Sequence, residues 1–93
     1  MEDKVYAKYL GHKSFSGNQT IFRRLELEHH LIPQNYYRVK DAEEYAGRIY
    51  INVTNIPASV DSEPFEFYLK QDNNYIPYDK TNLVTSPKTL TKK

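Results

Sequence analysis

The stretch RIYINVT, residues 48–54, decides how we interpret the fold. Its isoleucines and valine alternate with Tyr50, Asn52 and Thr54, and β-branched and aromatic residues are typical of strands. Alternation with a period of two places apolar side chains on one face of a sheet and polar side chains on the other. We therefore expect residues 48–56 to form a strand, and we place it at the centre of a sheet.

Four further segments show a similar alternation. The pattern is clear in residues 4–10 and 65–70, and a shorter run covers residues 36–40. Residues 20–28 alternate less regularly, and we interpret them as a strand that pairs with the first one. In residues 75–78, Pro77 removes a backbone donor and confines the segment to the edge of a sheet.

The connections between these strands are short and contain turn-forming residues. Residues 11–19 predict a loop, and residues 72–74 predict a hairpin turn before the edge strand. Residues 41–47 predict one or two helical turns, because Asp41 can cap the N-terminus and Gly47 can end the helix. We expect a compact β domain over residues 1–79 and a flexible basic tail over residues 80–93.

Together these elements predict a mostly β, single-domain fold. Five to six short strands with one short helix suit a small antiparallel barrel or a curved sheet of the SH3-like or OB-like kind. A length of 93 residues is enough for one domain and too short for two.

Composition excludes several classes of protein. The chain has no cysteine, so it has no disulfide framework, and its net charge of +1 is far from that of a histone-like protein. It has neither a run of apolar residues long enough to span a membrane nor a signal peptide, so we expect a cytoplasmic protein without membrane contact. The richness in Lys, Asn and Tyr would suit an accessory protein of a phage or other mobile element.

The sequence gives little support for catalysis, a cofactor or a metal site. Glu26, Glu28, His29 and His30, together with His12, are the only cluster of candidate metal ligands. Adjacent histidines on a strand point to opposite faces, and neither a cysteine nor a zinc-helix histidine pair accompanies them. No nucleophile elbow or glycine-rich phosphate loop is present. We therefore expect no enzyme, no cofactor and no metal.

The feature that does indicate function is a set of aromatic residues interleaved with Lys and Arg on outward strand faces. Single-stranded nucleic acid is bound in this way, because bases stack on the rings while cations contact the phosphates. The residues that we expect to contact a partner are Tyr6, Lys8, Phe15, Phe22, Arg24, Tyr36, Tyr37, Arg38, Arg48, Tyr50, Tyr68 and Lys70.

Two other interpretations fit the same residues. Tyrosines on a solvated sheet face can simply stabilise the sheet, and Glu26, Glu28 and Glu66 interrupt the basic pattern. Alternatively, the protein is an adaptor or inhibitor that binds another protein through the tyrosines and through Phe15 in the polar loop 12–18. Phe15 could equally fold back and cap a barrel. The edge strand at 75–78 could also pair with a second copy in a homodimer.

Overall fold

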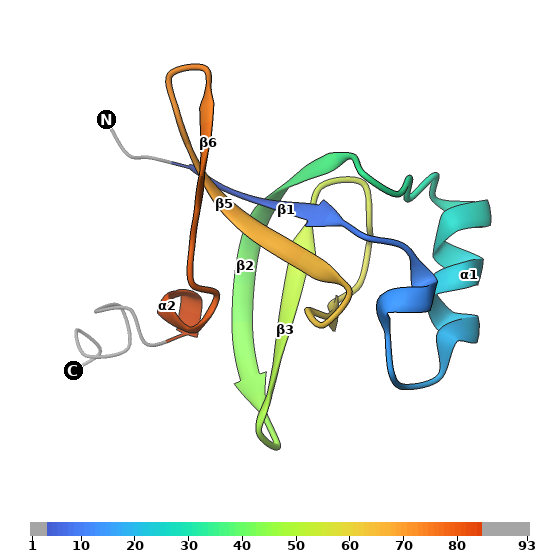
Figure 1. The fold of residues 1–93 in the computed structure, drawn as a ribbon. Coiled ribbons are helices and arrows are strands. Elements are labelled where there is room, and N and C mark those ends of the chain that lie inside the picture. The colour runs from blue at the N-terminus through green and yellow to red at the C-terminus, as the bar shows by residue number, and fades with distance from the viewer. Residues whose placement is uncertain (1–3, 85–93) are drawn as a thin grey trace.

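The computed structural model describes residues 4–84, which form one antiparallel sheet and a few short helical segments (Figure 1). The sheet order is β4-β3-β2-β1-β5-β6, and all neighbouring strands are antiparallel. The strands are β1 (Lys4–Tyr9), β2 (Tyr36–Tyr45), β3 (Arg48–Val53), β4 (Val60–Asp61), β5 (Phe65–Gln71) and β6 (Asn74–Pro77). The helical segments are η1 (His12–Ser14), α1 (Gln19–Glu28) and α2 (Thr81–Val84).

The prediction of a mostly β fold with five to six short antiparallel strands and a short helix is confirmed, and the sheet has six strands. The sheet is open rather than closed into a barrel within the described residues, because β4 and β6 form its two edges. The prediction that residues 48–56 are the central strand is wrong, since β1 and β2 occupy the middle and β3 lies next to the edge strand β4. Pro77 does lie on an edge strand, as expected.

One face of the sheet carries the hydrophobic core. Ala7 and Tyr9 of β1 lie beside Tyr37 of β2 and Phe65 and Phe67 of β5, and all of them are buried. The remaining core residues come from β3, β4, the helical segments and the connections; they are Phe15, Phe22, Leu31, Ile51, Val53, Ile56 and Val60. The alternation predicted for β1, β3 and β5 therefore sets which face is buried.

Residues 19–28 form a helix, so the predicted strand over residues 20–28 is wrong. The Asn18 side chain caps α1 by accepting a hydrogen bond from the Thr20 N–H at 3.0 Å. Phe22 is buried and Leu25 is half-buried, and their spacing of three residues places them on one side of a helix. Figure 1 shows that α1 lies beyond one end of β1, away from most of the sheet.

Residues 41–45 continue β2, so the predicted helical turns over residues 41–47 are wrong. Tyr45 pairs with Arg48, which leaves Ala46 and Gly47 as a two-residue hairpin loop with φ angles of 52° and 80°. Gly47 therefore serves a turn rather than the end of a helix. A bulge between Val39 and Asp41 shifts the register of β2 against β3.

After β6 the chain returns to the sheet as the short helix α2. Its Leu83 packs against the core, beside β2. The rest of the predicted tail, residues 85–93, lies outside the described residues. No helix within residues 4–84 is both long and apolar enough to cross a membrane.

Candidate functional site

The outer face of β2, β1, β5 and β6, opposite the core, carries an ordered array of tyrosines and basic residues. Strand pairing arranges them in three rows across the sheet. Rows on one face are two residues apart along each strand, which is about 6.6 Å. We call this surface the tyrosine face; its rows are Tyr36, Lys8 and Glu66, then Arg38, Tyr6 and Tyr68, then Lys4, Lys70 and Tyr75.

The four tyrosines of this face form one ring cluster. Tyr36 and Tyr75 come from strands on opposite sides of the β1–β5 pair, yet their rings stack with centroids 4.0 Å apart. Tyr6 meets Tyr75 edge-on at 5.8 Å, and Tyr68 meets Tyr36 edge-on at 5.6 Å. The cluster therefore forms a continuous aromatic surface across four strands.

Two lysines lie over these rings. Lys70 Nζ is 5.7 Å from the ring centroid of Tyr6 and 5.6 Å from that of Tyr75. Lys8 Nζ is 5.9 Å from the ring centroid of Tyr36. These cation–π contacts hold the ammonium groups at the aromatic surface.

The charge of the tyrosine face is strongly one-sided. Four of its nine residues are basic, and Lys4 stands directly opposite Lys70 in the β1–β5 pairing. Like charges in such positions repel each other and destabilise a sheet. Glu66 is the one acid of this face, and its Oε1 accepts a hydrogen bond of 2.8 Å from the Tyr68 hydroxyl. That hydrogen bond raises the pKa of Tyr68 above its ordinary value, with smaller contributions from burial and from the Glu66 charge.

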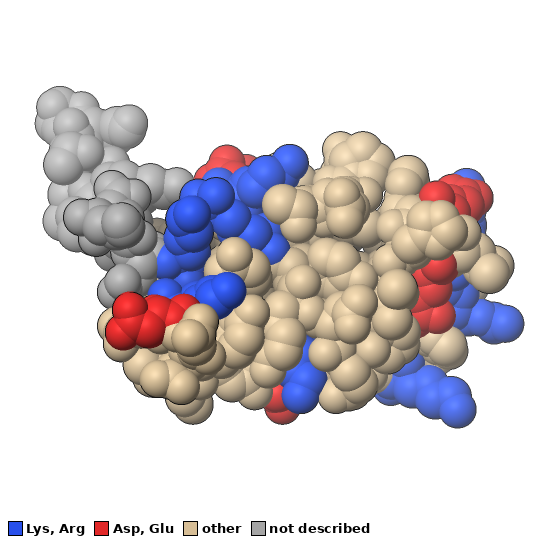
Figure 2. Space-filling model, turned by 90° about the horizontal axis from the view of Figure 1, so that it is seen from above, with Lys and Arg blue, Asp and Glu red and all other residues tan. Residues whose placement is uncertain are grey.

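Charge is also unevenly distributed over the surface as a whole. Figure 2 shows Lys and Arg side chains gathered at one side of the view from above, next to a broad uncharged area. Acidic side chains border this group, and at the other side of this view acidic and basic side chains are also found together. A net charge of +1 therefore hides local concentrations of positive charge.

The structure brings six of the twelve predicted contact residues together on the tyrosine face. These are Tyr6, Lys8, Tyr36, Arg38, Tyr68 and Lys70. The cluster also includes Tyr75, which lies on the predicted edge strand but is not among the predicted contact residues. The sequence does contain the information needed to place Tyr75. A two-residue hairpin loop at Asp72-Asn73, in place of the predicted turn over residues 72–74, sets Tyr75 opposite Lys70 on the same face.

Three of the predicted contact residues lie in the core instead. Phe15 and Phe22 pack against each other with ring centroids 4.9 Å apart, and both are buried. Tyr37 is buried too, and its hydroxyl accepts a hydrogen bond from Ile32 N–H and donates one to the His30 carbonyl. Of the two roles considered for Phe15, the structure therefore shows the inward one, and these three rings present no open surface to a partner.

The other three predicted residues lie elsewhere on the molecule. Arg24 is on α1 and forms an exposed ion pair with Glu28 at 3.3 Å. Tyr50 stands between Glu43 of β2 and Asp61 of β4. These acidic neighbours disfavour contact with a phosphate at Arg24 or Tyr50.

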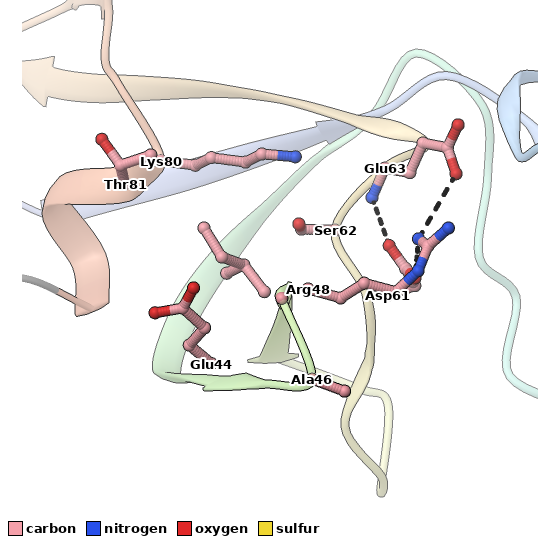
Figure 3. A pocket seen from close by; sticks show the side chains of 10 residues that line it. Glu44, Ala46, Arg48, Asp61, Ser62, Glu63, Lys80 and Thr81 are labelled. Carbon is pink, nitrogen blue, oxygen red and sulfur yellow. Dashed lines mark hydrogen bonds and ion pairs between the residues drawn. The ribbon is translucent and has the colours of Figure 1, made fainter.

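Arg48 lines a shallow pocket between the β2–β3 hairpin, β4 and the start of α2 (Figure 3). Its guanidinium donates to Asp61 at 2.7 Å and lies 3.8 Å from Glu63. Figure 3 shows the Lys80 side chain extending into the hollow toward Ser62. A hydrogen bond from Ser16, and to a lesser degree the charges of Arg48 and Lys80, lower the pKa of Glu63. Because the Arg48 guanidinium is already paired with Asp61 and Glu63, we do not regard this pocket as the functional site.

Of the candidate metal ligands, Glu26 and His12 contact each other between α1 and η1. Glu26 accepts a 2.6 Å hydrogen bond from the Tyr9 hydroxyl and also contacts the backbone N–H and the ring Nδ1 of His12. His29 ends α1, and His30 follows it. Across residues 4–84, no three or more His, Cys, Asp or Glu side chains are arranged to hold a metal ion.

Comparison with known proteins adds no family to this description. The chain matches no protein-family model, no curated protein and no solved structure.

Proposed function

We propose that the protein is a non-enzymatic binding module that contacts single-stranded nucleic acid through the tyrosine face. The observation that supports this proposal is the joint presence of four clustered tyrosine rings and four basic side chains on one sheet surface. Bases stack on aromatic rings, and Lys and Arg contact the phosphates that link them. Bases of a duplex are already stacked on their neighbours, so a single strand is the better ligand.

The placement of charge favours an anionic partner. Lys4 and Lys70 are direct neighbours across the β1–β5 pair, Arg38 lies in the adjoining row, and Lys8 lies in the row beyond it. A phosphate between two such cations relieves their repulsion and replaces the counterions that would otherwise collect there. The SH3-like or OB-like character expected from the sequence belongs to the same proposal, because small β folds of this kind bind single strands on an aromatic strand surface.

A protein partner is the second candidate function. The observation that favours it is the mutual stacking of Tyr36 and Tyr75, which covers one side of each ring. A preformed tyrosine cluster of this type suits the centre of a protein interface, where Tyr and Arg are enriched. The two candidates differ in their response to salt, because phosphate contacts weaken steeply as salt rises.

The test is a fluorescence-anisotropy titration of a labelled single-stranded oligonucleotide and the matching duplex, at low and at physiological salt. We expect tighter binding to the single strand and a loss of affinity with added salt. Tyr36→Ala should reduce affinity by roughly five- to a hundredfold, because loss of one base–ring stack costs about 1–3 kcal/mol. Lys70→Ala should reduce the slope of log affinity against log salt concentration by the amount that about one phosphate contact contributes.

Two matched controls lie outside the tyrosine face. Tyr45 is on the same strand as Tyr36 and is 73% exposed, so Tyr45→Ala should leave affinity unchanged. Lys13→Ala, in η1, removes the same charge as Lys70→Ala. Absence of binding to either oligonucleotide at tens of micromolar protein would refute the nucleic-acid proposal and favour a protein partner.

A further inference from the structure

Glu66 is the one carboxylate among the nine residues of the tyrosine face, and it is exposed. Strand pairing places it opposite Lys8, whose own neighbour across β2 is Tyr36. A negative charge in this position weakens phosphate binding, so non-specific attraction to a nucleic acid does not explain it. A carboxylate can, however, accept hydrogen bonds from the polar edge of a base.

The carboxylate is held in position by the ring next to it. The Tyr68 hydroxyl donates to Glu66 Oε1 at 2.8 Å, and the Tyr68 ring meets Tyr36 edge-on within the aromatic cluster. Within residues 4–84 this hydrogen bond is made to Oε1, and the carboxylate keeps lone pairs, including those of Oε2, that can accept from a ligand. A base that stacks beside Tyr68 therefore has its hydrogen-bonding edge within reach of a fixed acceptor.

Bases differ sharply in what they offer to such an acceptor. Cytosine presents an exocyclic amino group, N4, which donates hydrogen bonds, whereas thymine and uracil present the carbonyl O4 at the same position. A carboxylate attracts the first group and repels the second. The two pyrimidines have rings of similar size, so stacking alone distinguishes them little.

We infer that Glu66 is a specificity-determining residue that selects cytosine over thymine or uracil in a single strand, with Tyr68 as the residue that positions its carboxylate. This inference rests on the proposed function of the tyrosine face. It adds a preference among bases, which stacking and phosphate contacts by themselves do not give.

The test compares binding of the full-length chain to labelled ten-nucleotide oligomers of deoxycytidine and of thymidine, near neutral pH and low salt. We expect the wild type to bind the deoxycytidine oligomer about five- to tenfold more tightly, as one charge-assisted hydrogen bond allows. Glu66→Gln should abolish this preference, because an amide can also donate to thymine O4. It should also strengthen binding to the thymidine oligomer, because it removes a negative charge.

Two further variants separate specificity from charge and from folding. Glu43→Gln also removes one negative charge, but from β2 and at a position outside the nine residues of the tyrosine face. It should leave the preference for the deoxycytidine oligomer intact. Tyr68→Phe keeps the ring but removes the hydroxyl that holds Glu66. It should reduce the ratio of the affinity for the deoxycytidine oligomer to the affinity for the thymidine oligomer, with an unchanged melting temperature as evidence of folding.

The outcomes distinguish this inference from the function on which it rests. Equal affinity of the wild type for the two oligomers would overturn the role of Glu66 while leaving the tyrosine face as a binding surface. A preference that persists in Glu66→Gln would do the same. Absence of binding to both oligomers would overturn the proposed function and the inference together.

Discussion

At the scale of single residues, Glu26 joins three parts of the molecule. Glu26 belongs to α1, and its carboxylate accepts hydrogen bonds from the Tyr9 hydroxyl of β1 and from the backbone N–H of His12 in η1. Burial by itself would raise the pKa of Glu26, but the hydrogen bonds from Tyr9 and His12 outweigh burial and lower it. The ionised form of Glu26 therefore attaches the helical segments to the sheet.

This network predicts a dependence of stability on pH. Because the folded-state pKa of Glu26 lies below that of an unfolded glutamate, the unfolded chain binds more protons than the folded chain as the pH falls. The contribution of Glu26 to the free energy of unfolding is present above that unfolded value and is lost as pH falls through the folded pKa. Urea denaturation from about pH 6 to pH 2 should show a steeper loss for the wild type than for Glu26→Gln.

The comparison of these two proteins isolates Glu26, because other carboxylates with lowered pKa values, such as Glu63 and Asp79, are present in both. Parallel curves for the wild type and Glu26→Gln would contradict the proposed attachment.

At the scale of elements, the β2–β3 hairpin contains a residue that is poorly suited to its backbone conformation. Ala46 adopts a φ of 52° in the two-residue loop, where Asn-Gly is the preferred sequence. Left-handed backbone costs a residue with a Cβ roughly 1–2 kcal/mol, and Asn tolerates it better. Ala46→Asn should raise the free energy of unfolding by about 0.5–1 kcal/mol, as measured by urea denaturation.

Gly47 in the same loop provides the converse experiment. Its φ is 80°, and a Cβ added there would meet nothing within 4 Å, so Gly47→Ala tests backbone conformation alone. We expect this variant to lose about 1 kcal/mol of stability. A gain in Gly47→Ala, or a loss in Ala46→Asn, would be inconsistent with this turn.

The elements also show where sequence patterns are sufficient and where they fail. Strict alternation predicted β1, β3 and β5 correctly, because one face of each strand meets the core. In residues 20–28, Phe22, Leu25 and Glu26 fit a helical repeat as well as a broken strand repeat. The Asn18 cap and the contacts of Phe22 with Phe15 and of Glu26 with Tyr9 accompany the helix. Asp41 and Gly47 resembled helix caps, but pairing with β3 overrides local propensity.

Half of the predicted contact residues lie on the tyrosine face, because alternation within a strand indicates which side chains point outward. Tyr6, Lys8, Tyr68 and Lys70 follow from the alternation within β1 and β5. That they form one surface with Tyr36 and Tyr75 depends on the sheet order, which sequence patterns do not contain. Phe22 was assigned outward as part of a strand, and the change to a helix places it in the core.

At the scale of the whole molecule, the two sheet edges determine how the protein can associate. The backbone N–H of Tyr78 donates to the Phe67 carbonyl. Because backbone hydrogen bonds alternate along an antiparallel pair, the backbone groups of Ile76 point toward β5, and those of Tyr75 and Pro77 point away from the sheet. Pro77 has no N–H to offer to another strand, and β4 at the other edge has only two residues. Both described edges are therefore poor templates for strand addition.

We accordingly expect the protein to sediment as a monomer of 11.0 kDa in analytical ultracentrifugation. Pro77→Val restores an outward donor to β6 and should introduce association that increases with concentration. Pro57→Val, in the connection before β4, is the matched control and should remain monomeric. A wild-type dimer would show that some other surface mediates self-association.

In the central strand β1, odd-numbered residues serve folding and even-numbered residues serve binding. Ala7 and Tyr9 face the core, whereas Lys4, Tyr6 and Lys8 face outward, one in each row of the tyrosine face. In a saturation mutagenesis library sorted once for abundance and once for ligand capture, odd positions of this strand should limit the first sort and even positions the second. Two interleaved profiles along six residues would thus record folding and recognition separately, within a single strand.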